Sequence, residues 1–130
     1  MKPTGYIIAL FTGAALAANS AEAVMYGFGA ITANDTASAT AGESQLFVDV
    51  TDLGGGKAGF TFTNIGPAAC SITDVYFDDG TTASLSSLAS ITNGAGVSFT
   101  NGASPPNLPG SSAYSFTADF AMDTDSPAQP

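Results

Sequence analysis

The sequence predicts an all-β protein with the architecture of an antiparallel β-sandwich or a jelly roll. Apolar and polar residues alternate with a period of two in several short runs, which is typical of strands with one buried face. Turn-forming residues separate these runs at intervals of about 8–12 residues, as they do in sandwiches. Outside the N-terminal segment no apolar pattern with helical spacing extends over ten residues, and we therefore expect no long helix.

The segment 45–80 carries the clearest pattern, and it predicts three strands separated by turns at 52–57 and 64–67. Both turn segments contain the Gly, Asp, Asn or Pro residues that tight turns favour, and Asp-Asp-Gly at 78–80 closes the block in the same way. Side chains two residues apart should share the buried face of the first two strands: Leu46, Val48, Val50, Phe60 and Phe62.

The rest of the chain is interpreted from the same two signals, alternation and turn chemistry. In chain order we expect a strand at 26–31, an exposed polar loop at 32–42, either a helical turn or a short strand within 85–92, a strand at 97–99, a proline-containing loop at 101–112, a last strand at 114–119 and a frayed tail at 122–130. The apolar residues expected to form the core are Phe28, Ile31, Leu46, Val48, Val50, Phe60, Phe62, Ile72, Val75, Phe77, Val97, Phe99, Tyr114 and Phe116.

The first 23 residues have the three parts of a secretory signal peptide. Lys2 provides the positive charge, residues 6–18 form an uncharged and mostly apolar stretch, and Ala21-Glu22-Ala23 fits the rule for cleavage after Ala23. A membrane anchor is the alternative, but the apolar stretch is shorter than the roughly 20 residues that span a bilayer. We therefore expect a signal peptide at 1–23, a single β-sandwich domain at 24–130, and no stable membrane span after cleavage.

The charge of the chain argues against one class of partner. Eleven Asp and Glu residues against two Lys and Arg give a net charge of −9, and the chain has no histidine. Because phosphate binding needs clustered Lys and Arg, we expect no nucleic-acid partner. The hydrophobic fraction of 45% nevertheless argues for a folded core rather than disorder. Cys70, the only cysteine, is expected to be a small buried residue, because a reactive thiol needs basic neighbours.

Catalysis is not expected from this set of residues. Ser-His-Asp and Cys-His arrangements both need a histidine, which the chain lacks. A carboxylate pair can cleave glycosidic bonds, but it needs shifted pKa values in a cleft, and most acids here lie beside glycine or at strand ends. Lys57 follows three glycines in a turn and is a poor partner for a Ser-Lys dyad. We predict that the protein is not an enzyme and has no catalytic residue or organic cofactor.

Asp74, Asp78 and Asp79 are the candidate ligands of a metal ion, and calcium is the metal that they suit. Asp49 and Asp52 can lie across the sheet from them. Calcium takes six to eight oxygen ligands, often from several carboxylates and loop carbonyls. The spacing matches neither an EF-hand loop nor a glycine-aspartate repeat. A solvated acidic turn is the alternative, and the incomplete ligand set favours it.

Carbohydrate binding on exposed aromatic rings is a further hypothesis. The chain has no Trp, and the tyrosines beyond the signal are Tyr26, Tyr76 and Tyr114. Tyr76 flanks the acidic turn, and alternation places it on the face opposite Val75 and Phe77. A role in the core or on the sheet surface is the alternative for all three tyrosines.

Two stretches of the chain resemble a known group of proteins. The stretches QLFVDVTDLGGGKAGFTFTNIGPAACSITDVYFDDG at 45–80 and ITNGAGVSFTNGASPPNLPG at 91–110 resemble secreted bacterial proteins that carry a PEP-CTERM sorting signal. That group implies export, a C-terminal Val-Pro-Glu-Pro-type motif with a transmembrane helix and a basic tail, processing by an exosortase, and association with exopolysaccharide and biofilm matrix. The sequence ends at Pro130 without such a motif, so we expect only the N-terminal part, with a sandwich incomplete at its C-terminus.

Residues and resemblance together predict a secreted, non-enzymatic structural or interaction protein of the bacterial extracellular matrix or cell surface. Its expected partners are extracellular polysaccharide or other matrix proteins. The alternative function is a calcium-assisted carbohydrate-binding module.

Overall fold

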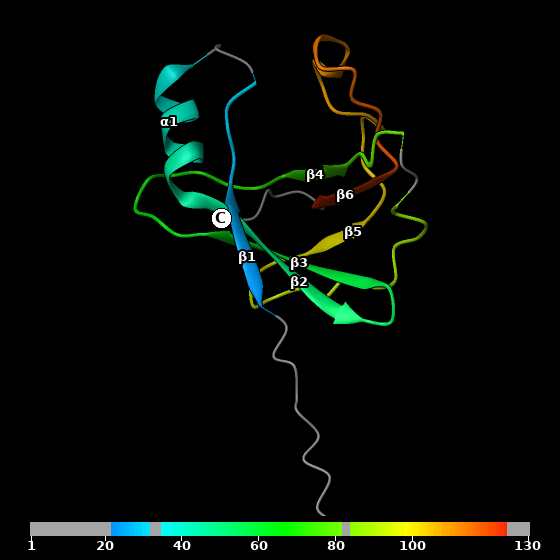
Figure 1. The fold of residues 1–130 in the computed structure, drawn as a ribbon. Helices are drawn as coiled ribbons and strands as arrows, with labels where there is room; N and C mark the ends of the chain where they lie inside the picture. Colours follow the sequence, from blue (N-terminus) through cyan, green and yellow to red (C-terminus); the bar gives the residue numbers. More distant parts are fainter. Residues whose placement is uncertain (1–21, 32–34, 82–83, 125–130) are drawn as a thin grey trace, which may run out of the picture.

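The computed structural model describes residues 22–31, 35–81 and 84–124, and the predicted signal peptide lies almost wholly outside them. The described chain is mostly strands, arranged in two small antiparallel sheets with one α-helix (Figure 1). The elements in order are β1 (Ala23–Gly27), α1 (Thr36–Gln45), β2 (Leu46–Gly54), β3 (Lys57–Asn64), β4 (Asp74–Phe77), β5 (Phe99–Asn101), the 3₁₀ turn η1 (Ser111–Ala113) and β6 (Phe120–Thr124).

The first sheet has the order β1-β2-β3, and its central feature is the β2–β3 hairpin. Three consecutive glycines build the turn, and Gly54, Gly55 and Gly56 have φ values of 73°, 61° and 72° that other residues rarely adopt. The Asp52 carboxylate accepts the backbone N–H of Gly54 at 2.7 Å and fixes the start of the turn. The two strands and the turn predicted here are confirmed.

One face of this sheet is apolar because the register aligns apolar residues across the strands. Val24 lies opposite Val50, which lies opposite Phe60, and the next row on this face joins Tyr26, Val48 and Phe62. Val48, in the middle strand, is 9% exposed and is one of two buried apolar residues among those that the structure describes. Residues of the alternate set, such as Asp49 and Thr61, point to the opposite face.

The third predicted strand leaves this sheet and starts another. The second sheet has the order β4-β6-β5, in which Val75 pairs with Met122 and Phe77 with Phe120. Met122 also pairs with Asn101 of β5 and is 9% exposed, which makes it the buried centre of the second sheet. The pairing of β4 with β6 joins segments more than 40 residues apart, and local sequence patterns do not reveal it.

Aromatic rings provide contacts between the two sheets. The Phe77 ring of β4 lies edge-on to Phe60 at 4.9 Å between centroids and to Phe62 at 6.0 Å. Edge-to-face pairs of this kind contribute about 0.5–1.5 kcal/mol each beyond the burial of their area. The predicted assignment of Phe60, Phe62 and Phe77 to one apolar cluster therefore agrees with the structure.

Helix α1 contradicts the exposed loop expected at 32–42 and the expectation that no helix reaches ten residues. Its sequence, TASATAGESQ, has no apolar stripe, so helical periodicity gives no signal. Its start is set by Asp35, whose carboxylate accepts the backbone N–H of Ala37 at 3.0 Å and the hydroxyl of Ser38 at 2.5 Å. These two hydrogen bonds hold the pKa of Asp35 below its ordinary value, and the bond from the Ser38 hydroxyl has the larger effect.

The end of α1 is anchored by a buried amide, which we call the Gln45 junction (Gln45, Asn64, Gly66, Ala68 and Cys70). Gln45 is 2% exposed, and its side-chain amide donates to Asn64 Oδ1 at 2.9 Å and to the Ala68 carbonyl at 2.8 Å. Its side-chain oxygen accepts the Ala68 N–H at 3.2 Å. The Asn64 amide donates onward to the Cys70 carbonyl at 2.7 Å. The junction therefore joins helix, hairpin and the irregular 65–73 connection.

Several predicted strand limits are wrong. The first strand is 23–27 rather than 26–31, the strand at 97–99 is shifted to 99–101, and the segment 85–92 is irregular rather than helical or extended. The last strand, expected at 114–119, is at 120–124, so residues 122–124 of the expected frayed tail belong to β6. Ser115, inside the expected strand, has a φ value of 52°, and this turn conformation breaks the expected run.

The core is smaller than predicted. Of the described apolar residues only Val48 and Met122 are buried, and Met122 was not among the expected core residues. Phe28, Ile31, Phe60 and Tyr114 were expected inside, but 43%, 41%, 37% and 59% of their surfaces are exposed. The reason is geometric: the strands of the second sheet have three to five residues, against nine and eight in β2 and β3, so the second sheet covers only part of the first.

Candidate functional site

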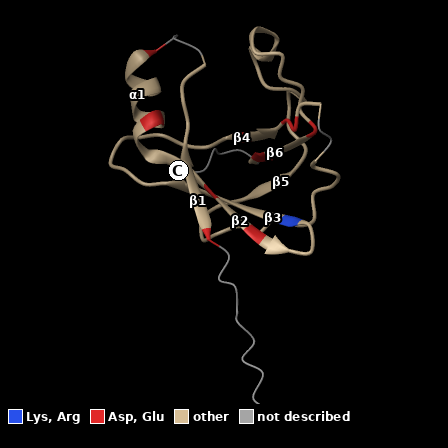
Figure 2. Cartoon of the chain, viewed as in Figure 1, with Lys and Arg blue, Asp and Glu red and all other residues tan. Residues whose placement is uncertain are grey.

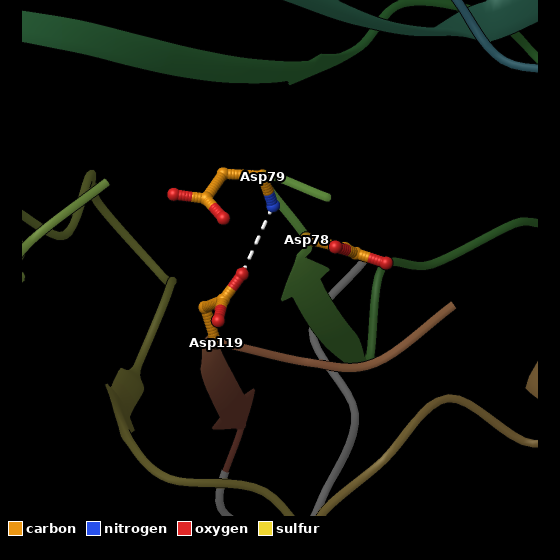
Figure 3. A group of neighbouring side chains, drawn as sticks. All are labelled: Asp78, Asp79 and Asp119. Carbon is orange, nitrogen blue, oxygen red and sulfur yellow. Dashed lines mark hydrogen bonds between the residues drawn. The ribbon is translucent and has the colours of Figure 1, made fainter. Parts of the chain in front are cut away.

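Three aspartates meet where β4 ends and β6 begins, and we call them the acidic cluster (Asp78, Asp79 and Asp119). Oxygens of all three carboxylates lie within 4.8 Å of one another (Figure 3). The fold explains the meeting, because Phe77 pairs with Phe120 and antiparallel strands bring the residues just after one strand to those just before the other. Asp78 and Asp79 are half-buried, and Asp119 is exposed.

The carboxylates of the cluster accept hydrogen bonds from loop backbone. Asp119 accepts the N–H of Asp79 at 2.9 Å, as drawn in Figure 3, while its own N–H donates to the Phe77 carbonyl at 2.8 Å. Asp78 accepts the N–H groups of Gly80 at 2.6 Å and Thr117 at 2.8 Å.

Asp79, the third member of the cluster, also accepts a backbone hydrogen bond. Asp79 accepts the backbone N–H of Leu85 at 2.7 Å. The cluster therefore links residues 78–80 and Leu85, which follow β4, to residues 117–119, which precede β6. These carboxylates give loop backbone N–H groups acceptors within the protein.

The cluster has part of the ligand set of a hard cation. Carboxylate oxygens are the ligands that calcium prefers, but calcium takes six to eight of them. Three carboxylates that each bind through one oxygen supply three of those positions, and each already accepts at least one backbone N–H. A bound calcium ion would therefore need loop carbonyls or water for its remaining positions.

The structure separates the sequence-predicted metal ligands. Asp78 and Asp79 belong to the cluster, whereas Asp74 lies at the opposite end of β4, opposite Asp123, and accepts the Thr73 hydroxyl at 2.8 Å. Asp49 and Asp52, on the other sheet, are not members of the cluster. Sequence reasoning missed Asp119, because only the β4–β6 pairing brings it close, and Asp119 fell inside a wrongly predicted strand.

Tyr76 is not the exposed ring that a sugar platform needs. It is half-buried, and its hydroxyl donates to the Pro105 carbonyl at 2.9 Å. Partial burial raises the pKa of Tyr76 above its ordinary value, and the charges of Asp74 and Asp123 raise it further. Tyr26 and Tyr114 are more accessible, with 55% and 59% of their surfaces exposed.

The remaining chemistry of the described residues is sparse. Cys70 is a free, half-buried thiol rather than a fully buried one. Figure 2 shows acidic residues on the helix, the strands and the loops, with Lys57 at the start of β3. Within residues 22–31, 35–81 and 84–124, no helix is long and apolar enough to cross a bilayer.

Comparison of the chain with protein-family models, with curated proteins and with solved structures gave no match.

Proposed function

We propose that this chain is a secreted, non-enzymatic β-sandwich protein with a structural or binding role in the bacterial extracellular matrix or at the cell surface. The two sheets would form the layers of the sandwich, with Phe60, Phe62 and Phe77 between them. The N-terminal 23 residues would serve as the signal peptide, and the likeness to PEP-CTERM proteins points to exopolysaccharide or other matrix proteins as partners.

The proposal that the protein is not an enzyme is supported by the hydrogen bonds that the acidic cluster makes. Its carboxylates are engaged by loop N–H groups of Asp79, Gly80, Leu85 and Thr117, which is what a structural cluster does. A hydrolase of the two-carboxylate type instead needs one acid with a raised pKa facing its substrate.

Export and processing test the proposal. The full chain, expressed in a Gram-negative host with a C-terminal tag, should be recovered outside the cytoplasm with Val24 as its N-terminal residue. Ala23→Leu places a bulky residue at the cleavage position and should block processing, while Met25→Leu should be processed normally. Recovery of the unprocessed chain in the cytoplasm would refute secretion. Binding to extracted exopolysaccharide in a pull-down would then support the matrix role.

The second candidate is a calcium-assisted carbohydrate-binding module, and the acidic cluster is the observation that favours it. Millimolar calcium should raise the melting temperature, and Asp119→Asn should abolish that rise. Asp49→Asn removes the same charge from the other sheet and should leave the rise intact. The same protein would then be applied to a glycan array with and without calcium. No change in melting temperature at millimolar calcium would exclude the calcium-assisted mode.

A further inference from the structure

The apolar face of the first sheet extends beyond the part that the second sheet covers. Phe60 and Phe62 contact Phe77 of the second sheet, but Val24 and Tyr26, on the same face of β1, are 50% and 55% exposed. These two residues lie in register with Val50 and Val48, which places them at the uncovered margin of one continuous apolar face.

The backbone along this margin is also open. Strand β1 pairs with β2 on one side only, and among the described residues no other strand pairs with its second side. All five of its residues are exposed. Every other backbone N–H and C=O along the free side of an edge strand points outward, so β1 offers a row of hydrogen-bonding groups to an incoming strand.

The extended segment that continues β1 enlarges the apolar surface. We call residues 24–31 the open edge. Phe28 stacks on Phe62 at 6.3 Å and remains 43% exposed, and Ile31 is 41% exposed. The Ile31 carbonyl accepts the Tyr114 hydroxyl at 3.2 Å and the Ala30 N–H donates to Glu43 at 2.7 Å, so the C-terminal end of the segment is held in place.

The open edge lacks the devices that normally protect an edge strand. Edge strands avoid association through charged residues, proline or bulges. No charged residue and no proline occurs between Ala23 and Ile31. The acids close to the open edge lie outside it: Glu22 before the strand, Asp49 opposite Met25 on β2, and Glu43, which accepts the Ala30 N–H.

We propose that the open edge is a self-association surface, on which β1 of a second copy pairs antiparallel with β1 around a two-fold axis near Met25. That register places Val24 beside Tyr26 of the other copy, and no charged side chain of β1 faces another. The first sheets of the two copies then form one continuous sheet.

The exposed surface of the open edge is large enough to bind a second copy of the chain. A specific interface buries at least about 1,000 Å² in total, or about 500 Å² on each partner. The open edge carries Val24, Met25, Tyr26, Phe28 and Ile31, each 41–62% exposed, and large side chains of this kind offer surface of that order. A strand of any other partner would fit the backbone equally, but the uncharged, self-complementary sequence favours a copy of the same chain.

The charge of the chain gives this association a distinctive salt dependence. Each full-length copy carries a net charge of −9, so two copies repel one another outside the uncharged contact. Salt screens this repulsion, with a Debye length of about 10 Å at 0.1 M and about 3 Å at 1 M. Self-association should therefore become tighter as salt is added, whereas binding of a basic partner would weaken.

Sedimentation velocity over a concentration series tests the proposal on the secreted protein, with its N-terminus established by sequencing. The wild type should pass from monomer to dimer and dimerise more tightly at 1 M than at 0.1 M NaCl. Met25→Lys should weaken dimerisation at least tenfold, because two lysines meet at the axis. Its fold should survive, because Asp49 lies opposite residue 25. Leu53→Lys is the matched control: it adds the same charge at a residue that is 64% exposed, and it should leave dimerisation unchanged.

Hydrogen exchange provides a readout that needs no variant. Amides of β1 on the open side should become protected as the protein concentration rises, while amides of the hairpin turn at 54–56 should not. A wild type that stays monomeric at millimolar concentration would overturn the proposal. Equal weakening by both lysine substitutions, or a dimer in which the β1 amides exchange as in the monomer, would place the contact elsewhere and overturn it too.

Discussion

The Gln45 junction should be a principal source of stability, and Gly66→Ala is the substitution that examines it most directly. A methyl group built on Gly66 would lie 2.3 Å from Gln45 Oε1, 2.7 Å from its Cβ and 2.9 Å from its Cδ. Contacts this short force a displacement. The Gln45 Cβ is attached to the end of a helix and cannot rotate away, so the whole side chain has to move.

The displacement should break the three hydrogen bonds between the Gln45 side chain, Asn64 and Ala68. Each such bond contributes about 0.5–1.5 kcal/mol, and a buried amide left without a partner costs about 1–3 kcal/mol. Ala68 is exposed and can be rehydrated, which limits the loss. We expect Gly66→Ala to lower the free energy of unfolding by about 2–4 kcal/mol.

Urea unfolding followed by far-ultraviolet circular dichroism measures this loss. Gln45→Met, which keeps the length and removes the polar atoms, should cost about as much. The double variant should lose less than the sum of the two, because both substitutions break the same bonds. Gly42→Ala is the matched glycine control, because its methyl group meets only Leu46 Cδ1 at 3.7 Å. The reasoning is wrong if the free energy of unfolding of Gly66→Ala lies within about 0.5 kcal/mol of the wild-type value. It is also wrong if the losses caused by Gly66→Ala and Gln45→Met add fully in the double variant.

Three further predictions follow from the contacts described above. Phe77→Ala removes the ring between the sheets and should lower the free energy of unfolding by about 2–3 kcal/mol in the same urea assay, below the range of about 3–5 kcal/mol for a fully buried ring. In a spectrophotometric titration of tyrosinate, one tyrosine should ionise above the ordinary tyrosine pKa of 10.0, and Tyr76→Phe should remove that component. Because the folded-state pKa of Tyr76 is raised, its contribution to stability is complete below pH 10.0 and is lost as the pH rises through the folded-state pKa. The pKa of Asp35 is lowered from 3.8, so its contribution is complete above that pH and is lost as the pH falls through the folded-state pKa. Asp35→Ala should reduce the helical signal at neutral pH and remove this acid-dependent loss, which circular dichroism from pH 6 to pH 2 would detect.

Local patterns were sufficient for the hairpin and for its faces. Alternation along β2 and β3 assigns Val48 and Phe62 to one side because side chains of a strand alternate by geometry alone. The glycine turn at 54–56 follows from the backbone conformations that glycine alone adopts readily. Asp78 and Asp79 were found in the same way, as acids in a turn after a strand.

The features that sequence patterns did not predict depend on contacts between distant segments, or on hydrogen bonds that produce no periodic pattern of residues. Helix α1 is built by the Asp35 cap and the Gln45 junction rather than by an apolar stripe, so a pattern of spacing does not reveal it. Asp119 joins the acidic cluster only through the pairing of β4 with β6. The partition of the strands into two small sheets, and with it the thin core and the open edge of β1, was decided by tertiary packing, because alternation fixes the face of a side chain but not the strand beside it.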